Sequence, residues 1–318
     1  MATTLAIDSA GERFVLSGRE TFLLGASYHA ALGAPKDFIE DDLSDLKIAG
    51  VNWLRVWATW AGFDHDISAV DADGDERAPY WRKLLWLCEF ADKLSVAVAV
   101  TLSPADPTSG APLLDGEAAH LAAAAAIAEG LRPLRNVYFD LAAERNQPGP
   151  AGVPIATVRK LRDLVKRIDP DRLVTASHAG DIEPDRLYEY LVTAKVDFLA
   201  PHRPLGPASP GETEAKTRTL RSRMARLGKV VPIHYQQPFR RDAGDWQPTA
   251  EDFLADLTAA LAGGAAGWCF HNGPTAGRPN LRPRRCFDLR PAEGRLIDQL
   301  QDDERTVLSG LKGVLGGE

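Results

Sequence analysis

The sequence predicts an α/β protein: a single (β/α)8 barrel domain over residues 1–318, with a short N-terminal β-hairpin. Short apolar or β-branched runs alternate with longer amphipathic stretches along the whole chain, which is the pattern of parallel strands joined by crossover helices. Eight such pairs follow one another without a long linker. The 318 residues are enough for one barrel, because that fold needs about 250.

The first half of the chain supplies four strand and helix pairs. A hairpin in residues 13–28 leads into the first strand, and the amphipathic stretch after it ends at Gly50, a residue suited to a helix C-terminus. Apolar and β-branched runs predict the next strands, and longer leucine- and alanine-rich runs predict the helices. In order, the predicted elements after the hairpin are helix 37–50, strand 51–57, helix 80–94, strand 96–103, helix 117–131, strand 136–142 and helix 155–169.

The second half repeats this pattern. Pro170 ends the fourth helix, and a short helix starting near Pro184 separates the fifth strand from the sixth. The remaining predicted elements are strands 172–177 and 196–201, helix 212–228, strand 229–235, helix 250–264, strand 265–270 and a last helix near 293–313. The alternative fold is an open doubly wound sheet. It would need a glycine-rich phosphate turn after its first strand, and GASYHAALGAP lacks G-x-G-x-x-G.

Composition narrows the choice of partners. The formal charge of −7 comes from interspersed acids and bases without a long basic tract, so nucleic acid is not expected as a partner. No apolar run reaches the ~18 residues that a membrane span needs, and the N-terminus lacks the pattern of a signal peptide. We therefore expect no membrane association and a cytoplasmic location. A secreted protein whose signal peptide had been removed would have the same sequence pattern.

The three cysteines are Cys88, Cys269 and Cys286. Their odd number and distant spacing give neither a disulfide framework nor a zinc pattern. We expect them to be reduced and mostly buried, and we expect no cofactor.

Polar and aromatic residues gather where the predicted strands end. In a barrel the carboxyl ends of the strands face one shared cup, which holds the functional groups. A polar cup with aromatic walls suits a sugar, because the C–H face of a pyranose packs on an aromatic ring and its hydroxyls need hydrogen-bonding partners. Alternatively, several of these aromatic residues only plug the barrel. The strand-end residues are Tyr28, His29, Arg55, Trp57, Trp60, Glu144, Arg145, Asn146, Ser177, His178, His202, Arg203, His234, Tyr235, Gln236, Gln237, Trp268 and His271.

Five segments carry a resemblance to a known family: GVNWLRVWATW, NVYFDLAAERN, DFLAPHRP, VPIHYQQPFRR and GAAGWCFHNG. They resemble strands two, four, six, seven and eight of the clan of (β/α)8-barrel glycoside hydrolases with two catalytic glutamates, the clan of family 5 and the cellulases. The motifs occur in the right order, and the resemblance covers essentially the whole chain. It implies a hydrolase that cleaves a glycoside or oligosaccharide by retaining double displacement.

The resemblance also implies roles for particular residues. The arginine that supports the nucleophile falls on Arg55, the acid/base glutamate on Glu144, the nucleophile on Gln237 and the strand-eight tryptophan on Trp268. The clan usually has an asparagine before the acid/base residue, where it holds the 2-hydroxyl of the sugar, but this chain has Ala143. The other residues expected to bind substrate are Tyr28, His29, Trp57, Trp60, Asn146, His178, His202, Tyr235 and His271.

Gln237 is the second departure from the family pattern. Glutamine is nearly isosteric with glutamate but has no anionic oxygen to attack the anomeric carbon, so double displacement should fail. Three explanations stay open. The chain is a deliberate Glu→Gln variant that binds substrate without turnover, or a natural pseudoenzyme that binds carbohydrate, or an enzyme in which another carboxylate or the substrate's own N-acetyl group replaces the nucleophile.

Other carboxylates bear on the third explanation. Asp106, Asp181 and Asp242 lie in loops after strands three, five and seven, and capping of those loops is the alternative role for each. Asp140 shares the strand parity of Glu144 and is expected to pair with an arginine such as Arg55 inside the barrel.

A metal-dependent barrel hydrolase is the rival class. Histidines at five proposed strand ends suggest it: His29, His178, His202, His234 and His271. Such enzymes generally use His-x-His on strand one and an aspartate on strand eight, and ASYHAAL and GWCFHNG offer neither. We therefore predict no metal site, and we expect the histidines of strands five, six and eight to hydrogen bond sugar hydroxyls or the catalytic carboxylates.

Overall fold

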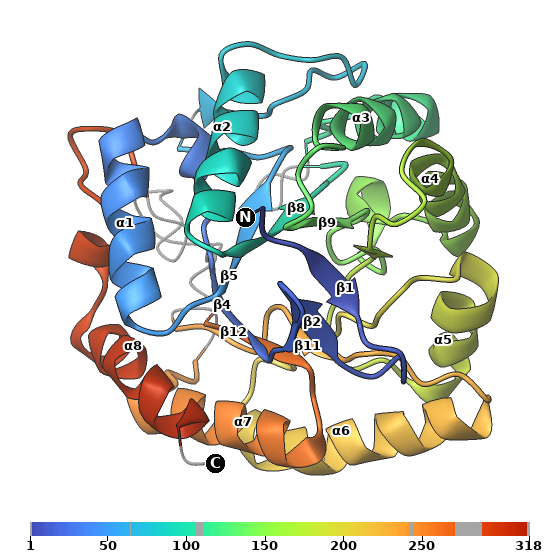
Figure 1. Ribbon diagram of the computed structural model, residues 1–318, viewed down its shortest axis with the longest axis vertical. Helices are drawn as coiled ribbons and strands as arrows, with labels where there is room; N and C mark the ends of the chain where they lie inside the picture. Colours follow the sequence, from blue (N-terminus) through green and yellow to red (C-terminus); the bar gives the residue numbers. More distant parts are fainter. Residues whose placement is uncertain (1, 64, 106–110, 242–244, 271–287, 317–318) are drawn as a thin grey trace.

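A computed structural model describes residues 2–63, 65–105, 111–241, 245–270 and 288–316. Helices surround a ring of parallel strands (Figure 1). The predicted (β/α)8 barrel is confirmed.

Seven strands of the barrel form one hydrogen-bonded parallel sheet in the order β10-β9-β8-β5-β4-β12-β11. Side chains alternate along each strand. On β5, for example, Trp53 points into the barrel, and Leu54 packs in the core between the strands and the helices. The strands are β4 (Leu23–Ser27), β5 (Trp53–Trp57), β8 (Ala97–Thr101), β9 (Val137–Asp140), β10 (Val174–Thr175), β11 (His234–Tyr235) and β12 (Gly267–Phe270).

The predicted sixth strand, residues 196–201, closes the ring without forming a continuous ladder. Single parallel bridges join His178 to Pro201 on one side and Leu199 to Ile233 on the other. The backbone N–H of His234 donates to the carbonyl of Leu199 at 2.8 Å. This segment therefore fills the gap between β10 and β11.

The helices follow the apolar periodicity of the sequence. On α4, for example, Val158, Leu161 and Val165 are buried, and they recur every three or four residues. The last helix begins later than the predicted residue 293, because Gln301 forms a capping box with Glu304. The helices are α1 (Lys36–Ile48), α2 (Tyr80–Lys93), α3 (Gly116–Gly130), α4 (Ile155–Ile168), α5 (Pro184–Tyr188), α6 (Ser209–Arg226), α7 (Ala250–Gly263) and α8 (Asp302–Leu315), with a π-helical turn, η3 (Glu189–Ala194), after α5.

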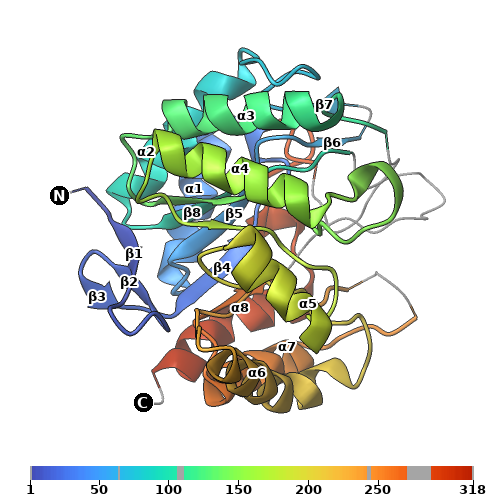
Figure 2. The same cartoon turned by 90° about the vertical axis from the view of Figure 1, so that its right-hand side faces the viewer.

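The N-terminal segment fills one end of the barrel. The predicted hairpin is formed by β2 (Phe14–Leu16) and β3 (Arg19–Glu20), and β1 (Leu5–Ile7) adds a third antiparallel strand. Phe14 meets Phe198 edge to face at 5.1 Å between ring centroids, inside the barrel. Figure 2 shows these strands at the end opposite to the short ribbon of β6 and β7, which follows β5. The functional groups therefore lie at the other, carboxyl end.

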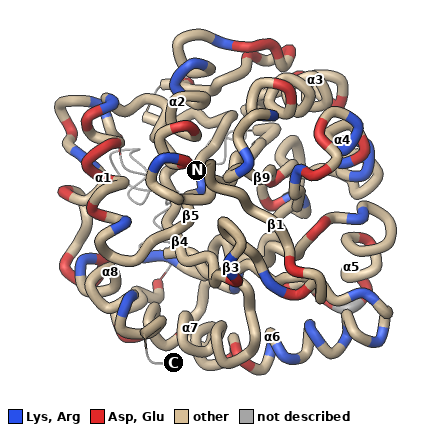
Figure 3. Tube along the Cα trace, in the orientation of Figure 1, with Lys and Arg blue, Asp and Glu red and all other residues tan. Residues whose placement is uncertain are grey.

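Charged residues of both signs are interspersed over the outer helices (Figure 3). On α6, for example, Glu214 pairs with Arg218 one turn later. No helix in the described part of the chain has the length and apolar character to cross a membrane. Cys88 and Cys269 are buried free thiols, as predicted, and burial raises the pKa of each to about 12. Cys286 lies outside the described residues.

Candidate active site

Arg55 is the centre of a hydrogen-bonded cluster at the carboxyl ends of the strands. It lies on β5, and its side chain is 1% exposed. Its Nη2 donates to Oδ2 of Asp140 on β9 at 2.8 Å, and its Nη1 donates to Oε1 of Gln237 at 2.9 Å. The expected pairing of Asp140 with Arg55 is confirmed. The buried positive charge is thereby balanced, and the guanidinium is fixed against the side chain of residue 237.

Glu144 lies beside this cluster, in the turn that follows β9. Its Oε1 is 2.7 Å from Nδ1 of His202 and 3.4 Å from Nε2 of Gln237, which donates to it. Its Oε2 accepts a hydrogen bond from Nε2 of Gln147 at 2.6 Å. The residue has a φ of 45°, a left-handed backbone conformation that residues other than glycine rarely adopt. We call the space around Arg55, Glu144 and Gln237 the cup.

Donors surround the Glu144 carboxylate. Burial raises its pKa, but the hydrogen bonds from His202 and the Gln147 amide and the charge of the Arg55 guanidinium outweigh burial and lower the pKa to about 2. Burial lowers the pKa of His202, although Glu144 opposes that shift. The neutral Nδ1–H tautomer satisfies both neighbours of His202, since Nδ1 then donates to Glu144, and Nε2 accepts from Arg55 Nη1 at 3.4 Å. Glu144 is thus ionised at neutral pH.

The contact between residues 144 and 237 bears on the chemistry. Retaining glycosidases hold two carboxyl groups roughly 5 Å apart, on either side of one anomeric centre. Here the Nε2 atom of Gln237 and the Oε1 atom of Glu144 are 3.4 Å apart, with Arg55 behind them. The two side chains are close enough to flank a single sugar carbon.

His29 and Trp57 form an aromatic wall next to Arg55. Their rings stack at 3.7 Å between centroids and 17° between planes, and the Arg55 guanidinium lies 4.5 Å from the centre of the Trp57 ring. Burial, with a contribution from Arg55, lowers the pKa of His29 well below its usual value, so the imidazole is neutral. Trp60 lies in the loop after β5, where its ring meets Phe63 at 6.1 Å between centroids and lies against Gly62 of the short ribbon.

Three aromatic residues predicted to bind substrate point away from the cup. The Tyr28 hydroxyl donates to Asp42 of α1 at 2.8 Å, the Tyr235 hydroxyl lies 2.6 Å from the Thr217 hydroxyl of α6, and Trp268 Nε1 donates to Asp256 of α7 at 2.7 Å. All three are buried. Strand alternation turns them to the helix layer, so in this structure they pack in the barrel wall, and their contact with substrate stays a prediction.

Asn146 and His178 lie together next to the Glu144 turn, with 3.3 Å between Asn146 Nδ2 and His178 Nε2. The amide of Asn146 is bonded to the backbone of Ala179 through both Oδ1 (2.7 Å) and Nδ2 (3.1 Å). His178 Nδ1 is 2.8 Å from the hydroxyl of Tyr190. Burial, together with the nearby Arg145, lowers the pKa of His178 to about 4, so its ring is neutral. Asn146 and His178 line a cavity of about 620 Å³.

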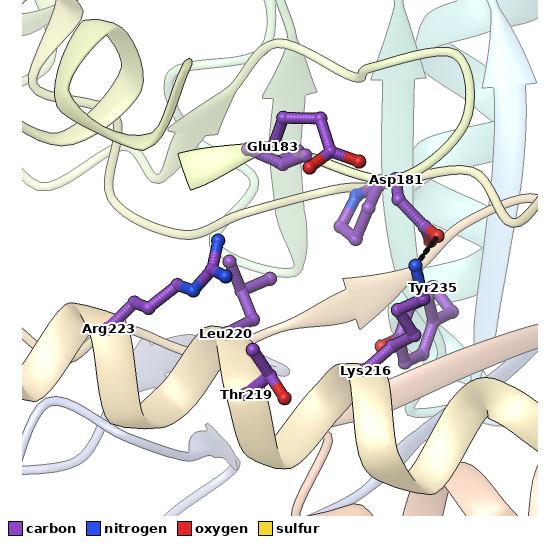
Figure 4. Close-up of a pocket in the computed structure, with 9 residues that line it drawn as sticks. Asp181, Glu183, Lys216, Thr219, Leu220, Arg223 and Tyr235 are labelled. Atoms are coloured by element: carbon purple, nitrogen blue, oxygen red, sulfur yellow. Dashed lines mark ion pairs between the residues drawn. The ribbon is translucent and has the colours of Figure 1, made fainter. Parts of the chain in front are cut away.

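Asp181, a candidate for an alternative catalytic carboxylate, is paired with bases outside the cup. Figure 4 shows its side chain directed at Lys216 of α6, with 3.2 Å between the charged atoms. It also pairs with Arg203. These contacts give Asp181 a structural role between β10 and α6. Three other predicted residues, Asp106, Asp242 and His271, lie outside the described residues.

The described histidines do not converge on one point. His202 contacts Glu144, His178 contacts Tyr190, and His234 is buried inside the barrel with its Nδ1 atom 3.2 Å from the Tyr138 hydroxyl. Within the described ranges, no group of three or more His, Cys, Asp or Glu side chains is arranged to hold a metal ion.

Gln147 is the contact of Glu144 that the sequence reasoning missed. It follows Glu144 by three residues, and its backbone N–H donates to the Glu144 carbonyl at 2.8 Å, which closes a tight turn. Ser177 adds support, since its Oγ accepts from the Glu144 backbone N–H at 2.9 Å. Asn146, followed by Pro148 and Gly149, was the available signal for such a turn.

No protein-family model matches the chain, and no curated protein matches it by sequence. Solved structures do match it. A variant of the family 5 mannosidase from Rhizomucor miehei, solved with mannosyl-fructose, has a TM-score of 0.70 at 14% identity and covers 98% of this chain and 97% of its own. The endo-1,4-beta-mannanase from the same organism has a TM-score of 0.68 at 11% identity and covers 99% and 100%.

A third structure agrees with these two. The exo-beta-1,4-mannosidase from Opitutaceae bacterium strain TAV5 has a TM-score of 0.66 at 17% identity and covers 97% of this chain and 62% of its own. The chain therefore shares the barrel fold of glycoside hydrolase family 5, as the five sequence motifs indicated.

Proposed function

We propose that the chain is a glycoside-binding barrel of the retaining glycosidase type. Glu144 has the acid/base position, and Gln237 occupies the position of the nucleophile. The observation that carries this proposal is the contact chain from Arg55 Nη1 to Gln237 Oε1 (2.9 Å) and from Gln237 Nε2 to Glu144 Oε1 (3.4 Å), at the ends of three different strands. Barrel enzymes draw their catalytic residues from several strand ends in this way.

The amide at position 237 predicts binding with little or no turnover. In double displacement, a carboxylate oxygen bonds to the anomeric carbon as the bond to the leaving oxygen breaks, and the acid/base residue gives that oxygen its proton. Gln237 has no negative charge for the first step. Glu144, with a pKa of about 2, has no proton for the second at neutral pH.

Mannosides are the first substrate class to test. The solved structures of similar fold include mannosidases and a mannanase, one of them with a bound mannosyl-fructose. The stacked His29 and Trp57 rings supply an apolar wall, and the amides and neutral imidazoles around Glu144 supply donors and acceptors for sugar hydroxyls.

The experiment compares the chain with Gln237→Glu on aryl glycosides, β-mannosides first. We expect measurable hydrolysis only in Gln237→Glu. That hydrolysis should be lost in the double variant Glu144→Gln/Gln237→Glu, in which the amide lies at position 144 and the carboxylate at position 237. Calorimetry with manno-oligosaccharides should detect binding by the unchanged chain. Hydrolysis by the unchanged chain that survives Glu144→Gln would overturn the assignment.

A non-catalytic carbohydrate-binding protein is the second candidate. It is favoured by the satisfied amide of Gln237, which accepts from Arg55 and donates to Glu144. Oligosaccharide binding without hydrolysis in either form would support this candidate.

A further inference from the structure

The turn of residues 144–147 is held by two neighbouring segments, η3 and the loop after β10. Arg145 donates from Nε to the Tyr190 hydroxyl at 2.8 Å and pairs with Glu189. Asn146 is bonded to backbone atoms of the loop after β10. These contacts therefore fix the backbone of Glu144 in its left-handed conformation. The side chain of Gln147, the last residue of the turn, reaches back to the Glu144 carboxylate.

Both oxygens of Glu144 are occupied. Oε1 has His202 at 2.7 Å and Gln237 at 3.4 Å, and Oε2 has Gln147 at 2.6 Å. A general acid must present a protonated oxygen to the leaving group, so one of these partners has to withdraw. His202 is 2% exposed, and Gln237 is held by Arg55. Gln147 is only partly buried, and within the described chain its side-chain amide makes no other hydrogen bond.

The charged and titratable groups that face Glu144 come from three other segments. Arg55 lies on β5, His202 follows the sixth strand and Arg240 follows β11, where Glu144 raises its pKa against the opposing effect of burial. Asp140 is already paired with Arg55. Arg55 is held by Asp140 and Gln237, and His202 is buried, so the Gln147 amide is the adjustable part of the environment that favours the carboxylate.

Gln147 also forms part of the wall of the 620 Å³ cavity that Asn146 and His178 line. Known ligand sites have volumes of about 300–1,000 Å³, so the cavity has room for a sugar unit. Its lining includes the Asn146 and Gln147 amides, the neutral His178 ring and the Arg186 guanidinium. This set of groups suits hydroxyl groups.

We propose that Gln147 is a positioning residue that holds the Glu144 carboxylate by a hydrogen bond in the free protein and leaves it when a leaving-group sugar enters this cavity. The proposal rests on the assignment of Glu144 as the acid/base residue. On binding, Glu144 takes a proton from solvent. In Gln237→Glu, that proton passes to the glycosidic oxygen as its bond to the anomeric carbon breaks, and the carboxylate at position 237 bonds to the anomeric carbon.

The kinetic test uses Gln237→Glu as the parent and adds Gln147→Leu, which keeps the side-chain volume and removes the donor. The pH profile of kcat/KM reports the free protein, and that of kcat reports the complex. We expect Gln147→Leu to move the basic limb of kcat/KM upward by about one pH unit, a tenfold change in the protonated fraction, and to leave the limb of kcat nearly unchanged. Arg218→Met, which breaks an exposed ion pair on α6 outside the cup and the cavity, should leave both limbs in place. Unchanged limbs in Gln147→Leu would overturn the proposal.

A second measurement does not need activity. In the unchanged chain, the carboxyl carbon of Glu144 is followed by NMR with ¹³C-labelled glutamate and identified by its loss in Glu144→Gln. We expect its pKa to rise in Gln147→Leu and, with Gln147 present, on addition of β-1,4-mannotriose. If Gln147→Leu does not fold, Gln147→Met replaces it. An unchanged titration in the folded variant refutes the role of Gln147, whereas absent hydrolysis by Gln237→Glu with a shifted titration refutes only the proposed function.

Discussion

Removing the Arg55 guanidinium should lower the free energy of unfolding of the barrel. Arg55→Met keeps an unbranched apolar side chain, but Asp140, which is 0% exposed, loses its only cation among the described ion pairs. Asp140 keeps the Ser177 backbone N–H at 2.9 Å and the Ser177 hydroxyl at 2.8 Å. Breaking one partner out of a buried pair costs about 3–5 kcal/mol, because the other charge stays buried without compensation.

The expected change in melting temperature follows from chain length. An unfolding entropy of ~2.1 cal/mol/K per residue over 318 residues gives a change of ~1.5 °C per kcal/mol. Arg55→Met should therefore lower Tm by about 5–7 °C in circular dichroism melts, and urea unfolding gives the free energy directly. Adding Asp140→Asn removes the unpaired charge and should recover at least half of the loss.

Two results would refute this reasoning. One is a loss below about 1 kcal/mol in Arg55→Met, and the other is no recovery in the double variant. The matched control is Arg218→Met, which breaks an ion pair to Glu214 whose side chains are 64% and 45% exposed. That pair should contribute no more than about 0.5 kcal/mol, because water screens it.

Three further predictions concern the barrel wall and interior. Burial lowers the pKa of His234 well below its usual value, so the free energy of unfolding should fall as pH drops through the pKa of about 6.5 that histidine has in the unfolded chain. Urea unfolding should show that the loss of stability between pH 7 and pH 5 is smaller in His234→Asn than in the unchanged chain. An equal loss in both proteins would contradict this prediction. Gly267→Ala would put a Cβ atom 2.5 Å from His234 Cδ2 and 2.9 Å from the Leu23 carbonyl oxygen, so it should cost about 1–3 kcal/mol in the same assay. Tyr235→Phe removes the hydrogen bond to Thr217 and should lower the free energy of unfolding by about 1 kcal/mol. Calorimetry should show an unchanged glycoside affinity. Weaker binding would indicate that Tyr235 contacts the substrate.

The order of strands and helices could be predicted because apolar residues recur every second position in a strand and every three or four positions in a helix, and this difference extends over whole segments. The sixth strand shows the limit of that signal. Residues 196–201 have the composition of a strand, but they pair through single bridges to β10 and β11. The ladder depends on how the barrel closes, and closure is a property of all eight segments together.

The site could be predicted in part, because strand ends are readable but side-chain direction near them is not. Tyr235 faces α6, as alternation requires. The ladder of β11 ends there, and the next two residues both contact interior groups: Gln236 donates to Tyr138 at 2.6 Å, and Gln237 accepts from Arg55. Such a change of parity depends on backbone geometry. The same holds for Gln147, whose contact needs the left-handed φ of Glu144.

A single amide at position 237 affects both halves of the proposed mechanism. Its Nε2 atom donates to Glu144, so it favours the ionised form of that carboxyl. A carboxylate at this position would instead place a negative charge beside Glu144 and raise its pKa toward the range of a general acid. Gln237→Glu should therefore supply the nucleophile and the proton donor together, with Arg55 shared between the new carboxylate and Asp140. Activity gained by this change cannot be credited to the nucleophile alone. The NMR titration of Glu144 in both forms measures the second contribution directly.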